Sequence, residues 1–323
     1  MDLLQLRYFQ VVARYEHISR AAEELRVAQP SLSRVIARLE ADLGTALFDR
    51  RGRRIRLNAY GVTFLRHVER ALGELDDGRR AVRDARDQVL GRVALAAETL
   101  LTLTHVLGDF RAAHPRADVV LRQATAPEME RRLRAREVDF CLASQPLTGP
   151  TLHSVELARE EVLLAVPLGH RLAGRDRVTV AEIVDEPFVT TRIGTWPRAL
   201  LERLFAAEGR TPVLSCEGDE PGATGDLIGA GLGIGLVPEM SRRLPARVPA
   251  AWLRLDAPDC HRVLSLVWDR EAYVSAAALK FREFVTGRPF ASYGLPGAGA
   301  VGSPADGGAG GRPEGVAPSG GGV

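Results

Sequence analysis

Short polar side chains and two arginines share one face of a stretch that is expected to be helical. Apolar residues recur at helical spacing along residues 30–43 and fill the other face: Leu32, Val35, Ile36, Leu39 and Leu43. The polar face carries Gln29, Ser31, Ser33, Arg34, Ala37 and Arg38. Side chains of these kinds hydrogen-bond base edges and contact phosphates when a helix enters a major groove. The pattern therefore predicts a DNA-reading helix.

A second basic feature follows within a few residues. The run Leu47–Leu57 holds five arginines and reads as a two-stranded hairpin with Gly52 near its tip. A charge run of this kind is often only a solvated face. Its place directly after a reading helix favours contact with DNA instead.

Local signals set the elements that must position these residues. Ser19 is expected to cap a short helix that turns Ala21, Ala22 and Leu25 inward, and a turn follows through residues 26–28. Pro30 suits the first turn of the reading helix, and Gly44 can end it in the left-handed conformation. Two helices and a tight turn are predicted here.

Charge is divided unevenly along the chain. Residues 1–66 hold 12 arginines against 7 acidic residues, a net of +5, whereas all 323 residues carry only +2, so the remainder stands at −3. Positive charge gathered on one small module favours a nucleic-acid partner for that module. Three widely spaced cysteines fit neither a disulfide framework nor a CxxC metal pair, and buried thiols are preferred to a redox-sensing pair.

A long helix is predicted from Ala59 to Val89, capped by Asn58. Along it, Leu65, Val68, Leu72 and Leu75 form an apolar seam at 3-4-3 spacing, and the same phase continues through Arg79, Val82, Arg86 and Val89. Packing of the seam on its own domain is one explanation. We favour dimerisation, because this helix links two folded regions and has few intramolecular surfaces to cover.

From Gly91 onward, strands alternate with helices, which predicts an α/β region with mainly parallel pairing. Strands are expected at 93–97, 119–123, 140–143, 161–166, 188–191, 213–216, 234–237 and 263–268, and helices at 100–114, 127–136, 196–208, 223–230 and 274–285.

Ligands of such sheets bind beyond the strand ends, where helix N-termini point. The candidate ligand-binding residues at these ends are Glu98, Thr99, Thr102, Thr125, Ser144, Gln145, Thr190, Thr191, Arg192 and Thr195. Hydroxyls and one arginine suit a small carboxylate, and our hypothesis is that Arg192 clamps it. Glu98 could instead pair with an ammonium group, as in an amino-acid-like ligand. Helix capping alone would also explain several of the hydroxyls.

Three segments, Ile18–Leu25, Ala28–Arg34 and Leu39–Arg50, resemble the winged helix-turn-helix of LysR-type transcriptional regulators. One departure is Ala28, where many members carry a capping serine, a difference of about 1 kcal/mol. The resemblance covers residues 1 to about 287 and implies a sequence-specific, ligand-responsive transcriptional regulator. The predicted DNA-binding residues are Ser19, Gln29, Pro30, Ser31, Ser33, Arg34, Arg38, Arg50, Arg51, Arg53 and Arg54.

The same resemblance supplies the domain plan. It implies a winged helix-turn-helix at 1–58, a linker helix for dimerisation at 59–90, and an effector domain at 91–287. That domain would consist of two Rossmann-like subdomains, about 91–165 with 265–287, and 166–264, arranged like a periplasmic binding protein. Expected partners are a promoter inverted repeat, a small-molecule effector, a second copy or a tetramer, and RNA polymerase as a further candidate.

Other functions find little support in the sequence. HExxH, G-x-S-x-G and P-loop motifs are missing, so we expect no enzyme, no metal and no cofactor. The glycines of 229–235 end a helix and enter a strand, which argues against a dinucleotide fingerprint. A solute-binding protein and a ligand-independent repressor are the alternatives. No segment predicts a membrane span or signal peptide, so a cytoplasmic protein is expected, and the Gly/Pro-rich residues 288–323 are expected to be disordered.

Overall fold

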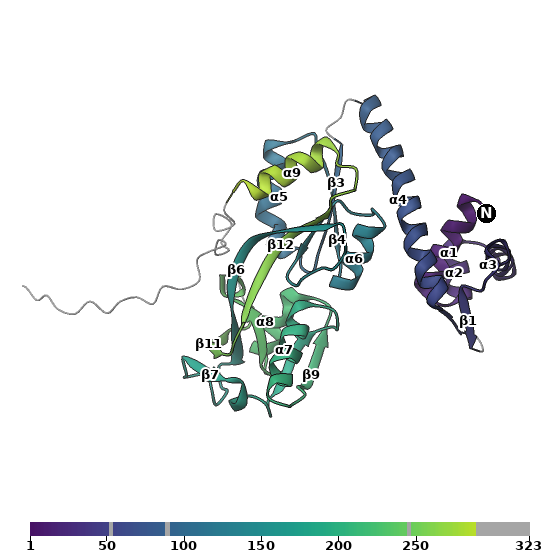
Figure 1. The fold of residues 1–323 in the computed structure, drawn as a ribbon. Helices are drawn as coiled ribbons and strands as arrows, with labels where there is room; N and C mark the ends of the chain where they lie inside the picture. Colours follow the sequence, from purple (N-terminus) through teal and green to yellow (C-terminus); the bar gives the residue numbers. More distant parts are fainter. Residues whose placement is uncertain (52–53, 88–90, 244–246, 289–323) are drawn as a thin grey trace, which may run out of the picture.

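The computed structural model describes residues 1–51, 54–87, 91–243 and 247–288. Its N-terminal module packs three helices and a hairpin around one core (Figure 1). Phe9 and Leu32 are fully buried there, and Phe48 meets Phe9 edge-on at 5.6 Å between ring centroids. The elements are α1 (Leu3–Tyr15), α2 (Ile18–Leu25), α3 (Gln29–Leu43), β1 (Phe48–Arg51) and β2 (Arg54–Leu57).

Two local expectations need correction. The cap of α2 is His17, whose Nδ1 accepts from the backbone N–H of Arg20 at 3.4 Å, so Ser19 lies inside the helix and not at its start. Leu43 is 36% exposed, because α3 ends at Gly44 and its last turn runs past the core. Gly44 adopts the predicted left-handed conformation with φ 69°.

The linker helix α4 (Ala59–Asp87) begins as expected, because the Asn58 side chain accepts from the N–H of Gly61 at 2.9 Å. Its apolar seam differs from the expectation. Val68 and Leu72 are only 2% and 3% exposed and belong to the core of the N-terminal module, where Leu65 also packs. These side chains are therefore used within the chain, whereas Leu75 is 44% exposed and remains available to a partner.

The effector domain is built on an eight-stranded sheet in the order β4-β3-β5-β12-β6-β11-β7, with β10 also paired to β6, and β8 with β9 forms a second, two-stranded sheet. The strands are β3 (Arg92–Ala97), β4 (Asp118–Gln123), β5 (Phe140–Ala143), β6 (Leu152–Pro167), β7 (Arg177–Thr179), β8 (Pro187–Thr191), β9 (Val213–Gly218), β10 (Gly235–Pro238), β11 (Ala250–Asp256) and β12 (His261–Asp269). The helices are α5 (Thr104–Ala113), α6 (Ala126–Arg134), α7 (Trp196–Ala207), α8 (Thr224–Gly229) and α9 (Ala276–Thr286).

The expectation of mainly parallel pairing is wrong for the centre of the large sheet. The strands β10, β11 and β12 all pair with β6 antiparallel, and β12 pairs antiparallel with β5. Parallel pairing is kept between β3 and its neighbours β4 and β5, and between β8 and β9. The returning strands β6 and β12 cause the difference, because antiparallel neighbours need no helical crossover.

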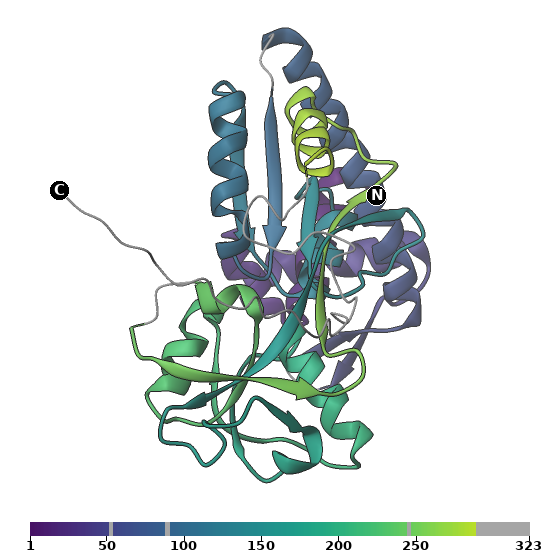
Figure 2. The same ribbon diagram turned by 90° about the vertical axis from the view of Figure 1, so that its left-hand side faces the viewer.

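Two separate cores lie along β6. The first includes Leu157, Phe110 and Phe281, and the second begins at Val162 and includes Phe188 and Phe205. Figure 2 shows β6 and β12 running from one half of the domain into the other. Two long strands thus join the halves, and a cleft between the halves is possible beside them.

Backbone-to-backbone packing accounts for the glycines of 229–235. A Cβ added at Gly229 would lie 2.5 Å from the carbonyl oxygen of Val248, and one at Gly233, where φ is 153°, would lie 2.5 Å from that of Pro187. These glycines allow the end of α8 and the start of β10 to approach their neighbours closely. None of the described helices combines the length and apolar character that a bilayer crossing requires.

Candidate functional site

The exposed face of α3 carries the predicted reading residues. Gln29, Pro30, Ser31, Arg34 and Arg38 are exposed and Ser33 is half-buried, so this face is open to a partner. Two local bonds order it: Gln29 Nε2 donates to Ser33 Oγ at 3.0 Å, and Arg34 Nε donates to the carbonyl of Pro30 at 3.3 Å. Ala28 supplies no side-chain cap, Pro30 has no N–H to donate, and the N–H of Ser31 donates to the carbonyl of Ala28 at 2.9 Å.

The hairpin beside α3 forms as expected, with Phe48 opposite Leu57 and Arg51 opposite Arg54. Glu16, which follows α1 in the left-handed conformation, holds it in place by accepting from the N–H of Leu57 at 3.0 Å. The predicted contacts Arg50, Arg51 and Arg54 have side chains outside the described part of the structure, and Arg53 lies wholly outside it.

A cavity between the two halves of the effector domain, called the cleft below, provides a second site. Thr99 and Leu101 line it from the first half, and Thr190, Thr191, Trp196 and Arg262 are among the residues that line it on the other side. Trp252, Thr224 and Ser241 line the cleft too. Hydroxyl groups, two tryptophans and one charged donor therefore face the same space. Such a mixture suits a small ligand with an anionic group and an apolar body.

Arg262 is a residue that the strand-end rule missed. Its side chain is 2% exposed and forms an ion pair with Glu160, itself 3% exposed, with 3.1 Å between Nη1 and Oε1. Its Nε donates to Ser144 Oγ at 2.8 Å, and its guanidinium lies 5.4 Å from the centre of the Trp196 ring. Arg262 thus ties β12 to β6, to the first half and to α7 at one point. Sequence offered only one signal, a charged residue directly before a predicted apolar strand.

Most of the predicted effector residues have structural partners. Glu98 is buried, accepting from Gln145 Nε2 at 2.9 Å and from the N–H of Trp196 at 3.3 Å, and burial raises its pKa. Thr125 forms a capping box with Glu128, Thr195 Oγ1 donates to the carbonyl of Arg192, and Thr102 Oγ1 donates to that of Thr99. Ser144 and Gln145 line a separate cavity on the other side of Trp196.

Arg192 is the clear correction. It is 44% exposed, does not line the cleft, and pairs with Asp219 at 3.3 Å and with Glu128 at 3.6 Å. Arg192 directly follows β8, and its side chain points outward. The chain then turns at Gly194, where φ is 90°, before α7 begins. The arginine at the cleft is Arg262.

Matches to family models decide the identity of the chain. Residues 3–62 match the bacterial regulatory helix-turn-helix protein, lysR family, and residues 86–289 match the LysR substrate binding domain. The chain belongs to the LysR family. It is a DNA-binding transcriptional regulator of this type, as the open face of α3 and the hairpin indicate.

Relatives extend over most of the regulator. It is 33% identical over 288 residues to the uncharacterized HTH-type transcriptional regulator YybE of Bacillus subtilis, covering 88% of this chain and 98% of that one. It is 31% identical over 294 residues to the transcriptional dual regulator GltC of the same species, covering 88% and 96%. These relatives are regulators and not enzymes.

Solved structures of LysR-type regulators share its fold. Full-length CbnR complexed with its target DNA is 25% identical, with a TM-score of 0.57, and covers 89% of this chain and 99% of that one. CbnR alone is 24% identical, with a TM-score of 0.59 and the same coverage. The predicted winged helix-turn-helix, linker helix and two-part effector domain are confirmed as a fold class.

Within the described ranges, no group of three His, Cys, Asp or Glu side chains is arranged to hold a metal ion. Burial raises the pKa of Cys260 to about 11 and that of the buried Cys141 as well, so both thiols stay protonated at neutral pH. Low thiolate content argues against a redox-sensing pair that uses either residue.

Proposed function

We propose that the regulator responds to a small carboxylate-bearing effector held in the cleft. The observation that carries this proposal is Arg262: its Nε and Nη1 have partners, whereas no hydrogen bond to a described residue involves its Nη2. Because Arg262 lines the cleft, that nitrogen can donate to an entering carboxylate. The hydroxyls of Thr99 and Thr190 line the same cavity and can also donate.

An amino-acid-like effector is the second candidate. Asp226 also lines the cleft, and its Oδ1 accepts from the N–H of Arg247 at 2.8 Å and from that of Val248 at 3.1 Å. No hydrogen bond from a described residue reaches its other oxygen, Oδ2, which can pair with an ammonium group. An effector of this type would pair its carboxylate with Arg262 and its ammonium group with Asp226.

A thermal-shift screen of the full-length protein against aliphatic acids, aromatic acids and amino acids tests both proposed classes of effector. A ligand at about 100 times its Kd should stabilise by about 2.7 kcal/mol, which raises Tm by several degrees. Thr99→Ala should weaken either class, Asp226→Asn only the amino-acid class, and Thr286→Ala at the far end of α9 neither. A flat screen across all three classes would favour the ligand-independent repressor.

The DNA-binding unit is proposed to be a homodimer or homotetramer that reads an inverted repeat. Support comes from α4, where Leu75 is 44% and Val82 72% exposed, seven residues apart beside Gly78. This spacing returns to the same helix face and suits a second copy of α4. Sedimentation of Leu75→Arg/Val82→Arg should give monomers, and an unchanged sedimentation coefficient would place the contact elsewhere.

A further inference from the structure

The junction between α4 and the first half of the effector domain is built from charges. The core of the N-terminal module ends at Leu72, and the cores of the first half begin at Val93, so among the described residues no buried apolar cluster draws on both. Polar interfaces without an apolar core leave two domains free to move unless directional bonds hold them. The bonds at this junction therefore decide how the two parts are oriented.

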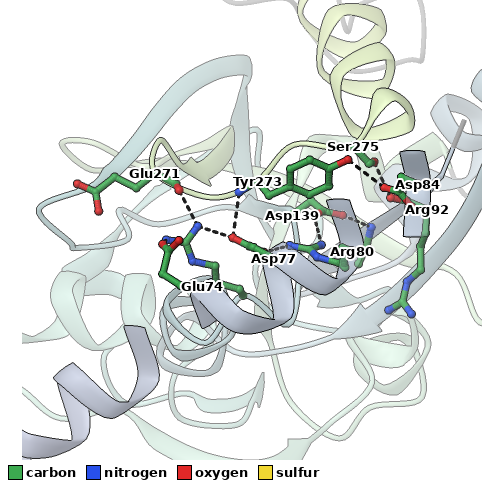
Figure 3. A network of polar contacts seen from close by, with 11 residues as sticks. Glu74, Asp77, Arg80, Asp84, Arg92, Asp139, Glu271, Tyr273 and Ser275 are labelled. Atoms are coloured by element: carbon green, nitrogen blue, oxygen red, sulfur yellow. Dashed lines mark hydrogen bonds and ion pairs between the residues drawn. The ribbon is translucent and has the colours of Figure 1, made fainter. Parts of the chain in front are cut away.

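Those bonds form an alternating chain of charges, called the linker clamp below and made of Arg136, Asp77, Arg80 and Asp139. Arg136 Nη1 donates to Asp77 Oδ2 at 2.7 Å, Arg80 pairs with Asp77, and Arg80 Nη1 donates to Asp139 Oδ1 at 2.8 Å. Asp77 and Arg80 lie on α4, whereas Asp139 precedes β5 and Arg136 follows α6. Figure 3 shows Asp77 and Arg80 of α4 pointing toward Asp139 and Tyr273.

Backbone groups of the effector domain complete the linker clamp. The N–H of Tyr273 donates to Asp77 Oδ2 at 3.0 Å, and the N–H of Ala94 in β3 donates to Asp139 Oδ2 at 2.7 Å. Arg136 Nη1 also donates to the carbonyl of Glu271 at 2.7 Å. Hydrogen bonds to fixed backbone groups constrain direction as well as distance, so this set specifies one angle of α4.

Two conformational penalties meet at the centre of the clamp. Arg136 adopts the left-handed conformation, with φ 54°, directly after the end of α6, where glycine is the favoured residue. Opposite it, Gly73 stands in the middle of α4, where glycine is unfavourable for a helix. A Cβ at Gly73 would lie 2.8 Å from Arg136 Cγ, so the missing side chain makes room for Arg136. Arg136 is unfavourable for its left-handed backbone position, and Gly73 is unfavourable for its helix. Together they fit, because the missing side chain of Gly73 leaves space for that of Arg136.

We propose that Arg136, seated against Gly73 and paired with Asp77, is a positioning residue that fixes the linker helix on the first half of the effector domain. The DNA-binding module and this half then move as one body. Movement caused by an effector is carried by the second half, which β6 and β12 join to the first. The inference concerns the joint and does not depend on the effector proposed above.

Distances between spin labels in the full-length protein test it. Labels at Tyr60→Cys on α4 and Leu279→Cys on α9, with Cys216 and Cys260 replaced by serine and the labelled chain diluted in unlabelled chain, report the angle of the joint. We expect one narrow distance distribution. Gly73→Ala should broaden and shift it, because the added methyl displaces Arg136, whereas Gly108→Ala within α5 should not, since nothing lies within 4 Å of its added Cβ.

Arg136→Gly separates positioning from folding. Glycine relieves the left-handed backbone, so Tm of the effector domain should stay equal or rise while the distance distribution broadens. A lower Tm with loss of a cooperative transition would overturn the proposal, because Arg136 would then hold its own subdomain together. Narrow, unshifted distributions in both Gly73→Ala and Arg136→Gly would overturn it equally. Arg136→Lys, which keeps the charge, should give an intermediate width.

Discussion

Arginines of the N-terminal module and of the effector domain stand in opposite surroundings. Arg34 and Arg38 on α3 are exposed, and neither has a carboxylate within ion-pair distance among the described residues. Arg136 and Arg262 have side chains only 4% and 2% exposed, and each pairs with a carboxylate. One residue type therefore serves two purposes, since an unpaired guanidinium is available to DNA whereas a paired and buried one fixes geometry.

The two groups of arginines should respond differently to substitution, one by a loss of DNA binding and the other by a loss of stability. Removing an exposed arginine should weaken DNA binding and leave folding unchanged. Removing Arg262 leaves Glu160 uncompensated in the interior and should reduce stability, whereas Asp77 keeps its pair with Arg80 when Arg136 is removed. The predictions below test this division at single positions.

The largest effect is expected for Arg262→Ala. Glu160 would be left buried without its cation, which should lower the free energy of unfolding by about 3–5 kcal/mol. Urea titration of the full-length protein measures it. The double variant Arg262→Met/Glu160→Met should recover most of the loss. A single variant as stable as the wild type would show that the pair contributes nothing.

The linker helix offers a buried and an exposed leucine one turn apart. Leu72→Ala opens a cavity in the core of the N-terminal module and should lower the free energy of unfolding by about 2–5 kcal/mol. Leu75→Ala should change it by less than about 0.5 kcal/mol, because that side chain is exposed in the single chain. Unfolding must be followed at a concentration where both variants have the same oligomeric state. Equal losses would refute the assignment of Leu72 to this core.

On the exposed side of the comparison, Arg34→Ala should weaken binding to selected operator DNA by about 1–3 kcal/mol, with the free energy of unfolding unchanged. Fluorescence anisotropy across a salt series checks it, and a lost phosphate contact also lowers the salt slope by about 1. Arg177→Ala, an exposed arginine of β7, is the matched control and should bind DNA normally. Equal weakening by both would indicate a nonspecific charge effect.

The smallest effect is expected at Glu98, where burial raises the pKa of the carboxyl. The folded state then binds the proton more tightly than the unfolded state, so stability falls as pH rises through the range between the two pKa values. Glu98→Gln removes this dependence. Its stability relative to the wild type should increase from pH 5 to pH 8, measured by urea titration at each pH, and the opposite trend would mean that the charged form is favoured.

Elements made by local signals were predictable. The turn after α2, the Gly44 stop, the Asn58 cap and the hairpin all follow from a few neighbouring residues. Ser19 was wrongly predicted as the cap of α2, because the cap is His17, a less usual capping residue that stands two residues earlier. Helical periodicity likewise showed that α4 has an apolar face. The same spacing, however, allows that face to pack either within its own chain or against a second copy.

Strands and ion pairs formed between distant residues could not be predicted from the sequence. The first half of β6 mixes charged and apolar residues, so only the buried stretch from 161 to 166 was predicted, and β7 and β11 were missed. Arg262 is the second residue of β12, at the amino end of the strand, whereas the rule searches carboxyl ends, and its partner Glu160 lies 102 residues earlier. Arg192 satisfied the strand-end rule but turns outward. Which arginine faces the cleft depends on how β6 and β12 meet.

The late position of β12 and α9 bears on how the protein is made. Phe281 packs against Phe110 at 5.1 Å between ring centroids, and β12 separates β5 from β6 in the sheet. A ribosome must therefore synthesise nearly the whole effector domain before its first half can close, whereas the buried core of the N-terminal module lies within the first 72 residues. A nascent chain can thus display a finished DNA-reading surface well before it can sense a ligand.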